Sequence, residues 1–72
     1  MSATQLNELD VVAVTVDLPD LSLARGQVGA VVHVHAPGVY EVEFVDHAGR
    51  TYAVATLPGE QLLPLRYEPA AA

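Results

Sequence analysis

Two histidines and a glutamate form the clearest cluster of side chains able to do chemistry in this sequence. His33 and His35 are two residues apart, and in a β-strand that spacing points both side chains to one face. Glu41 is expected directly opposite His33 on the next strand. Two imidazoles and a carboxylate can hold Zn²⁺, Ni²⁺ or Co²⁺, so these three residues are the candidate metal ligands. The alternative, which we favour, is a partly exposed cross-strand pair, and no cofactor is expected.

The other reactive residue types give no catalytic pattern. Glu41 and Glu43 share a strand face, but glycosidase chemistry needs carboxylates across a cleft, and adjacent residues of one exposed strand form none. His47 is expected to face solvent in a turn. Ser22 and Thr15 have no His or Asp at a spacing that indicates a triad. We therefore expect a protein that is not an enzyme.

Composition narrows the class of partner. The chain has 72 residues, enough for one domain, and nine acids against three arginines and no lysine give a net charge of −6. Nucleic-acid binding draws much of its affinity from Lys and Arg on phosphates, so it is disfavoured here. The acidic surplus would favour a basic protein partner through electrostatic steering, but the interpretation we favour is that a modest negative charge simply keeps a small apolar domain soluble.

The cellular compartment can be inferred from three features that the sequence lacks: cysteine, a membrane-spanning segment and a secretory signal. There is no cysteine, which excludes disulfides and thiolate metal sites and suits a reducing compartment. No apolar run has the length of a membrane span. The first ten residues contain acids and no basic residue, unlike a secretory signal. We expect a bacterial-type cytoplasmic protein with no membrane association.

Short apolar runs between turn signals predict a small all-β protein. We expect an N-terminal arm over 1–9, in which Leu6 and Leu9 pack on the domain, a five-stranded, partly open barrel over 10–66, and a flexible tail over 67–72. A tight helical turn is expected over 58–61. The predicted strands are Asp10–Val16, Val28 or Gly29 to His35, Val39–Val45, Arg50–Leu57 and Leu62–Leu65.

The segment 17–27 is predicted to be a long loop with Leu23 folded back onto the core. Gly26-x-x-Gly29 is not a phosphate loop, because no helix start or lysine follows it. We expect a positive φ at Gly26 and a close approach of another strand at Gly29.

Turn chemistry predicts the strand register. Asp46 to Gly49 fits a type I turn with a left-handed glycine, which pairs Asp46 with Arg50, Phe44 with Tyr52 and Val42 with Val54. A three-residue loop Ala36-Pro37-Gly38 pairs Ala30, Val32 and Val34 with Phe44, Val42 and Tyr40.

The predicted core is Val12, Val14, Leu23, Ala30, Val32, Val34, Tyr40, Val42, Phe44, Tyr52, Val54, Leu57, Leu62 and Leu65. The predicted outer face is Val31, His33, His35, Val39, Glu41, Glu43, Thr51, Ala53 and Ala55.

Several segments resemble known families. The matching residues are Leu9–Ala13, Asp17-Leu18-Pro19, Arg25-Gly26-x-x-Gly29-x-Val31-Val32, Tyr40–Phe44, Gly49–Ala53 and Leu57-Pro58-x-x-Gln61-Leu62. Their layout is similar to SH3-like small barrels, and more closely the chain resembles a family of small bacterial proteins of unknown function over about residues 9 to 65. The resemblance implies no catalytic residues, and an antitoxin-like or regulatory binding role. A looser similarity, at the level of fold alone, runs to nitrile hydratase β-subunit-like and KOW-like barrels.

The sequence therefore favours a protein-interaction module that binds a partner protein or itself, since an open barrel leaves strand edges that invite pairing. A metal-handling accessory protein using His33, His35 and Glu41 is the alternative, and KOW-like nucleic-acid binding comes third. The expected contact residues are Leu18, Leu21, Val31, His33, Glu41, Glu43 and Tyr67.

Overall fold

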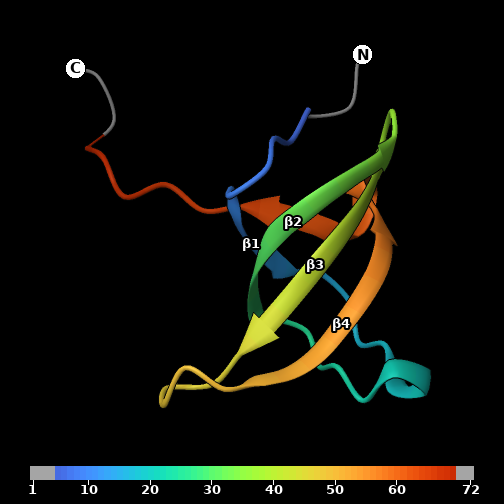
Figure 1. Ribbon diagram of the computed structural model, residues 1–72, viewed down its shortest axis with the longest axis vertical. Helices are drawn as coiled ribbons and strands as arrows, with labels where there is room; N and C mark the ends of the chain where they lie inside the picture. Colours follow the sequence, from blue (N-terminus) through green and yellow to red (C-terminus); the bar gives the residue numbers. More distant parts are fainter. Residues whose placement is uncertain (1–4, 70–72) are drawn as a thin grey trace.

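The described part of the chain folds into a single antiparallel sheet of five strands. The computed structural model describes residues 5–69, and Figure 1 shows β2 and β3 in front of β5, with β4 along one side. The strand order is β4-β3-β2-β1-β5. The all-β prediction is confirmed, and an open sheet of this kind fits a partly open barrel. The strands are β1 (Val11–Val14), β2 (Val28–Ala36), β3 (Val39–Val45), β4 (Thr51–Pro58) and β5 (Leu62–Pro64).

Between residues 5 and 69 the remaining elements are two short 3₁₀ turns. The turn η2 (Gly59–Gln61) lies where the sequence predicts a tight turn, between β4 and β5. The turn η1 (Pro19–Leu21) lies inside the predicted long loop. Leu23 is buried, as predicted, and a pair of backbone hydrogen bonds between Leu18 and Leu23 closes the loop on itself. None of the helices in the described part of the chain is long and apolar enough to cross a membrane.

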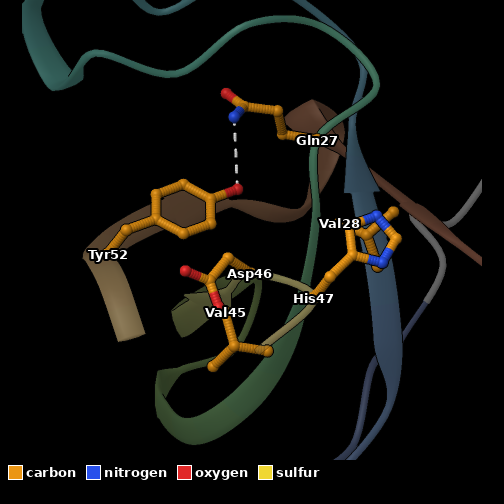
Figure 2. A pocket seen from close by; sticks show the side chains of 6 residues that line it. All are labelled: Gln27, Val28, Val45, Asp46, His47 and Tyr52. Atoms are coloured by element: carbon orange, nitrogen blue, oxygen red, sulfur yellow. Dashed lines mark hydrogen bonds between the residues drawn. The ribbon is translucent and has the colours of Figure 1, made fainter. Parts of the chain in front are cut away.

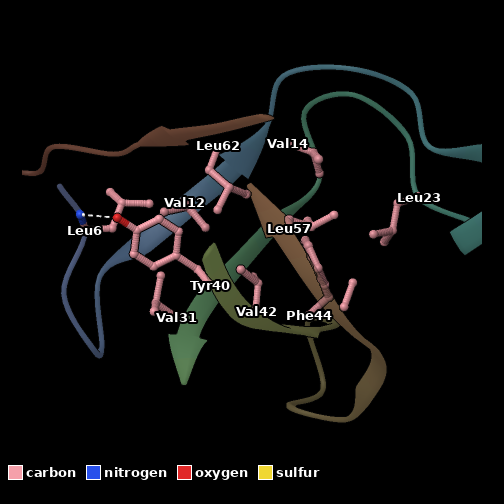
Figure 3. Close-up of a cluster of buried hydrophobic side chains, with 11 residues drawn as sticks. Leu6, Val12, Val14, Leu23, Val31, Tyr40, Val42, Phe44, Leu57 and Leu62 are labelled. Atoms are coloured by element: carbon pink, nitrogen blue, oxygen red, sulfur yellow. Dashed lines mark hydrogen bonds between the residues drawn. The ribbon is translucent and has the colours of Figure 1, made fainter. Parts of the chain in front are cut away.

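The N-terminal arm is held to the core by Tyr40. Leu6 is buried, and its backbone N–H donates to the Tyr40 hydroxyl at 3.2 Å, as the dashed line in Figure 3 marks. The packing predicted for Leu6 is therefore confirmed. Leu9 is 83% exposed and has a left-handed φ of 75°, so its predicted packing is wrong: the turn between Asn7 and Asp10 directs it outward.

The register between β2 and β3 differs from the predicted one because two residues bulge out of β2. His33 lies opposite Glu41 and Val34 opposite Tyr40, as predicted. The register shifts between Val31 and His33, and again between Val34 and Ala36. Each bulge inserts one extra residue and moves the rest of the strand to the other face.

The inner residues of β2 are accordingly Gly29 and Val31. Val31 is fully buried opposite Val42, and Gly29 lies opposite Phe44. The predicted core positions Ala30 and Val32 are wrong: Ala30 is partly exposed, and Val32 is 39% exposed. The outward placement predicted for Val31 is wrong for the same reason.

The turn between β2 and β3 is shorter than predicted. Ala36 pairs with Val39, so only Pro37 and Gly38 form the loop. Pro fits the second position of a type II turn, and Gly38 supplies the positive φ, 81°, that the third requires. The bulge at His35 compensates for the missing loop residue, which is why Val34 still meets Tyr40.

The turn between β3 and β4 has the predicted form, but the strand that follows it does not. Gly49 has a φ of 81°, and Asp46 N–H donates to the Arg50 carbonyl at 2.9 Å. A register shift then makes Tyr52 an extra residue. Phe44 consequently lies opposite Ala53, and Val42 opposite Ala55.

This shift reverses the two faces of β4. Ala55 is buried in place of Val54, which is 54% exposed, and Tyr52 is also exposed. The core placement predicted for Tyr52 and Val54 is therefore wrong, as is the outward placement of Ala55. Val34 and Leu65 are partly exposed rather than buried. The core, shown in Figure 3, consists of Leu6, Val12, Val14, Leu23, Val31, Tyr40, Val42, Phe44, Ala55, Leu57 and Leu62.

Gly29 provides a test of this register. A Cβ added at Gly29 would lie 2.7 Å from the Glu43 carbonyl oxygen and 2.9 Å from Phe44 Cδ2, so we expect Gly29→Ala to lower the free energy of unfolding by about 1–3 kcal/mol through overpacking. Gly38→Ala is the control, since its Cβ would meet open space and only the positive φ costs stability, about 1 kcal/mol. Urea unfolding measures both. A Gly29→Ala chain as stable as the parent would contradict the β2–β3 register.

Candidate interaction surface

The outward side of β2, β3 and β4 carries most of the side chains that the sequence singled out. Cross-strand pairing sets Ala30, Glu43 and Val54 in one row, and His33, Glu41 and Thr56 in the next. We define the outer face as the outward-pointing residues of these three strands: Ala30, Val32, His33, His35, Glu41, Glu43, Val45, Val54 and Thr56.

Three of the four apolar residues predicted for this face do not lie on it. The sequence assigned Val31, Val39, Ala53 and Ala55 to this face, but Val31 and Ala55 are buried and Ala53 packs against the core. Bulging instead leaves Val32 and Val54 exposed, and Val45 at the end of β3 is 46% exposed. The outer face therefore presents larger apolar side chains than the sequence predicted.

The two glutamates of the outer face are each held by a neighbour. His35 Nε2 lies 2.9 Å from Glu41 Oε1. Glu43 Oε2 accepts a hydrogen bond from the Thr51 hydroxyl. Residues two apart on a strand are separated by about 7 Å. Both carboxylates are thus fixed among exposed apolar side chains, each with a further oxygen available to a partner.

The histidine cluster comes together only in part as predicted. His33 lies opposite Glu41 in the backbone register, but the imidazole bonded to Glu41 is that of His35. The two imidazole rings pack edge to face, with centroids 4.7 Å apart. Within residues 5–69, no group of three or more His, Asp or Glu side chains has the proximity needed to hold a metal ion.

A second feature is a hollow at the end of the sheet, of about 500 Å³, lined by Gln27, Val28, Val45, Asp46, His47 and Tyr52. Figure 2 shows the Gln27 amide and the Tyr52 hydroxyl meeting across it, at 3.2 Å. Asp46 Oδ1 accepts hydrogen bonds from the Ala48 and Arg50 backbone amides, so its role is to close the turn. His47 is exposed, as predicted. Among the described residues, no histidine is hydrogen-bonded to a serine, threonine or tyrosine hydroxyl.

The remaining predicted contact residues lie outside the outer face. Leu18 is partly buried and packs against the core, whereas Leu21 on η1 is exposed. Tyr67 follows β5 and is also exposed. The sequence assigned these residues to the long loop and to the C-terminal end, and they lie in the segment between β1 and β2 and in the segment after β5.

A family model described as "Domain of unknown function (DUF4926)" matches residues 8–64. The chain belongs to this family. The matched residues contain all five strands of the sheet and therefore the whole outer face. The expected membership of a family of unknown function is confirmed. No curated protein and no solved structure matches the chain, and the SH3-like description remains a prediction.

The histidine pair provides a test of the metal alternative. We expect a chain carrying both His33→Ala and His35→Ala to keep its fold and to lose at most about 1 kcal/mol, because an exposed ion pair contributes little. Thermal unfolding with and without excess Zn²⁺ measures this, and Zn²⁺ should leave the midpoint of the parent chain unchanged. A rise of the midpoint with Zn²⁺ in the parent chain, absent from the double variant, would restore the metal alternative.

Proposed function

We propose that this chain is a non-enzymatic protein-interaction module, acting in the cytoplasm, whose outer face binds a basic partner protein. The observation that carries this proposal is the combination of Val32, Val45 and Val54, exposed on one sheet face, with the fixed carboxylates of Glu41 and Glu43 between them. Exposed apolar residues beside oriented charges are typical of protein-binding surfaces.

Charge supports a basic partner. The chain carries a net charge of −6, and acids on one surface raise the association rate of a positively charged protein. An arginine of the partner could bond a free carboxylate oxygen of Glu43 while its aliphatic stem covers Val54. Binding of this kind weakens as salt screens the charges.

A regulatory or antitoxin-like role fits such a module. A small domain that covers the basic surface of another protein can block access to that surface without chemistry of its own. In the hollow beside the outer face, Gln27 and Tyr52 bond one another and Asp46 bonds the turn.

Matched charge reversals test the outer face. The wild-type chain would be used to capture its partner from cells that naturally produce it, and dissociation constants would then be measured for purified variants. We expect Val32→Asn and Glu43→Arg each to weaken binding by about tenfold, the loss of one good contact. Asp20→Arg, on η1, changes the net charge by the same amount as Glu43→Arg and should leave the affinity within about twofold.

Two results would contradict the outer-face proposal. If Glu43→Arg and Asp20→Arg weakened binding equally, net charge alone would govern association and no specific face would be involved. If Val32→Asn left the affinity unchanged, the apolar part of the outer face would have no part in binding. All three substituted side chains are exposed or partly exposed, so each variant should fold. Circular dichroism of each variant checks that unfolding is not the cause of weaker binding.

A further inference from the structure

The sheet has two edges, and only one of them is open. The strand order leaves β5 and β4 at the ends. A sheet edge presents unpaired N–H and C=O groups to which another chain can add. The edge at β5 is blunted because the strand spans three residues and ends in Pro64. The edge at β4 spans eight residues, Thr51–Pro58, and runs along one side of the molecule in Figure 1.

Nothing in the described chain pairs with the free side of β4. Its backbone partners within residues 5–69 all belong to β3. The strand contains no charged residue. It consists of Thr, Tyr, Val, Ala and Leu residues up to Pro58, which is its last residue and its first proline. Native proteins usually protect an edge with charges, proline or short length. The middle of β4 has none of these devices.

Hydrogen-bond alternation identifies the groups at the free edge. Gly59 N–H donates to the Gly38 carbonyl at 2.9 Å. Bonded pairs recur at every second residue of an antiparallel ladder, so the next residues of β4 that bond β3 are Leu57, Ala55 and Ala53. Val54 and Thr56 lie between them, and their N–H and C=O groups therefore point away from β3.

We propose that a second copy of this chain adds to the free edge of β4 in antiparallel orientation, with Val54 of each copy opposite Thr56 of the other. This pairing satisfies the outward N–H and C=O of both residues. It places Ala55 on the two-fold axis, opposite Ala55 of the second copy, where the backbones approach most closely. The outer faces of the two copies then lie on one continuous sheet, and this assembly does not depend on the proposed partner protein.

Self-complementarity is the reason for choosing a second copy over another protein. A two-fold interface brings one patch against itself, so any charge near its centre would meet the same charge. β4 has no such charge. The strand also pairs favourably with itself, because Val opposite Thr joins two β-branched residues, which pack well in sheets. A chain of 72 residues buries a small core, and oligomerisation is a common source of added stability at that size.

Proline substitutions test the edge selectively. Proline removes a backbone N–H and is tolerated on an edge strand where that N–H faces solvent. We expect the wild-type chain to sediment as a dimer at concentrations of about 1 mM and to dissociate on dilution. Val54→Pro and Thr56→Pro should each weaken dimerisation by about tenfold or more, while the folded monomer persists. Ala55→Pro is the control, since it removes an N–H bonded to β3 and should unfold the monomer.

Amide hydrogen exchange of the wild-type chain gives an independent readout. In the dimer, the amides of Val54 and Thr56 should exchange at least about tenfold more slowly than in dilute solution. Those of Ala53 and Ala55 should be protected at both concentrations. Sedimentation as a monomer at about 1 mM, or equal exchange of Val54 and Thr56 at both concentrations, would overturn the proposal. Dimerisation of both proline variants with wild-type affinity would do the same.

Salt separates this proposal from the proposed function. Two copies of net charge −6 repel one another, and salt screens that repulsion, so the dimer should become tighter as ionic strength rises. Binding of a basic partner to the outer face should become weaker over the same range. A dimer that dissociates with added salt would contradict pairing through the uncharged edge, whatever the fate of the partner complex.

Discussion

The close approach of β2 and β3 at Gly29 is the constraint on which the rest of the structure depends. Gly29 lies opposite Phe44, and a side chain at this position would collide with the Glu43 carbonyl and with the Phe44 ring. Only a residue without Cβ lets the largest apolar ring of the core sit against the neighbouring backbone. Once Gly29 faces inward, Val31 follows it into the core, and Ala30 and Val32 face outward. The composition of the outer face is therefore a consequence of packing at Gly29.

The elements were predictable from the sequence because their signals are local. The turn at Asp46–Gly49, the positive φ of Gly26 and the helical turn after Pro58 all follow from residue types within a few positions. β3 has the predicted bounds, and the other strands agree within a few residues at each end. The register could not be predicted in the same way. Bulges at Val32, His35 and Tyr52 each insert one residue. When the inward and outward alternation of side chains is counted from a turn, the residues beyond a bulge are assigned to the wrong face of the sheet.

The candidate surface was predictable to the same extent. His33 opposite Glu41 was correct because the bulge at His35 compensates for the shorter loop, and the bulge at Val32 alters the register only beyond His33. The exposure of Val54 and the burial of Ala55 were reversed, because the Tyr52 bulge separates them from the turn that sets the register. Because β4 has apolar residues on both faces, its sequence pattern does not indicate which face is buried. For β2 the sequence did contain a signal, Gly29-x-Val31. A glycine at a close approach between strands faces the core, and the residue two positions later then faces the core as well.

The acidic residues are distributed so that the β4 edge, where a second copy is proposed to pair, carries no charge. Every acid lies outside β4, and the two nearest in the sheet, Glu41 and Glu43, lie on β3 with their carboxylates engaged by His35 and Thr51. A net charge of −6 keeps copies apart at long range, but screening by salt removes most of that effect beyond about 10 Å. In the proposed dimer, the groups that meet at contact distance are the uncharged backbone groups of Val54 and Thr56. The same chain can therefore remain dispersed through its net charge and still present one specific edge for pairing.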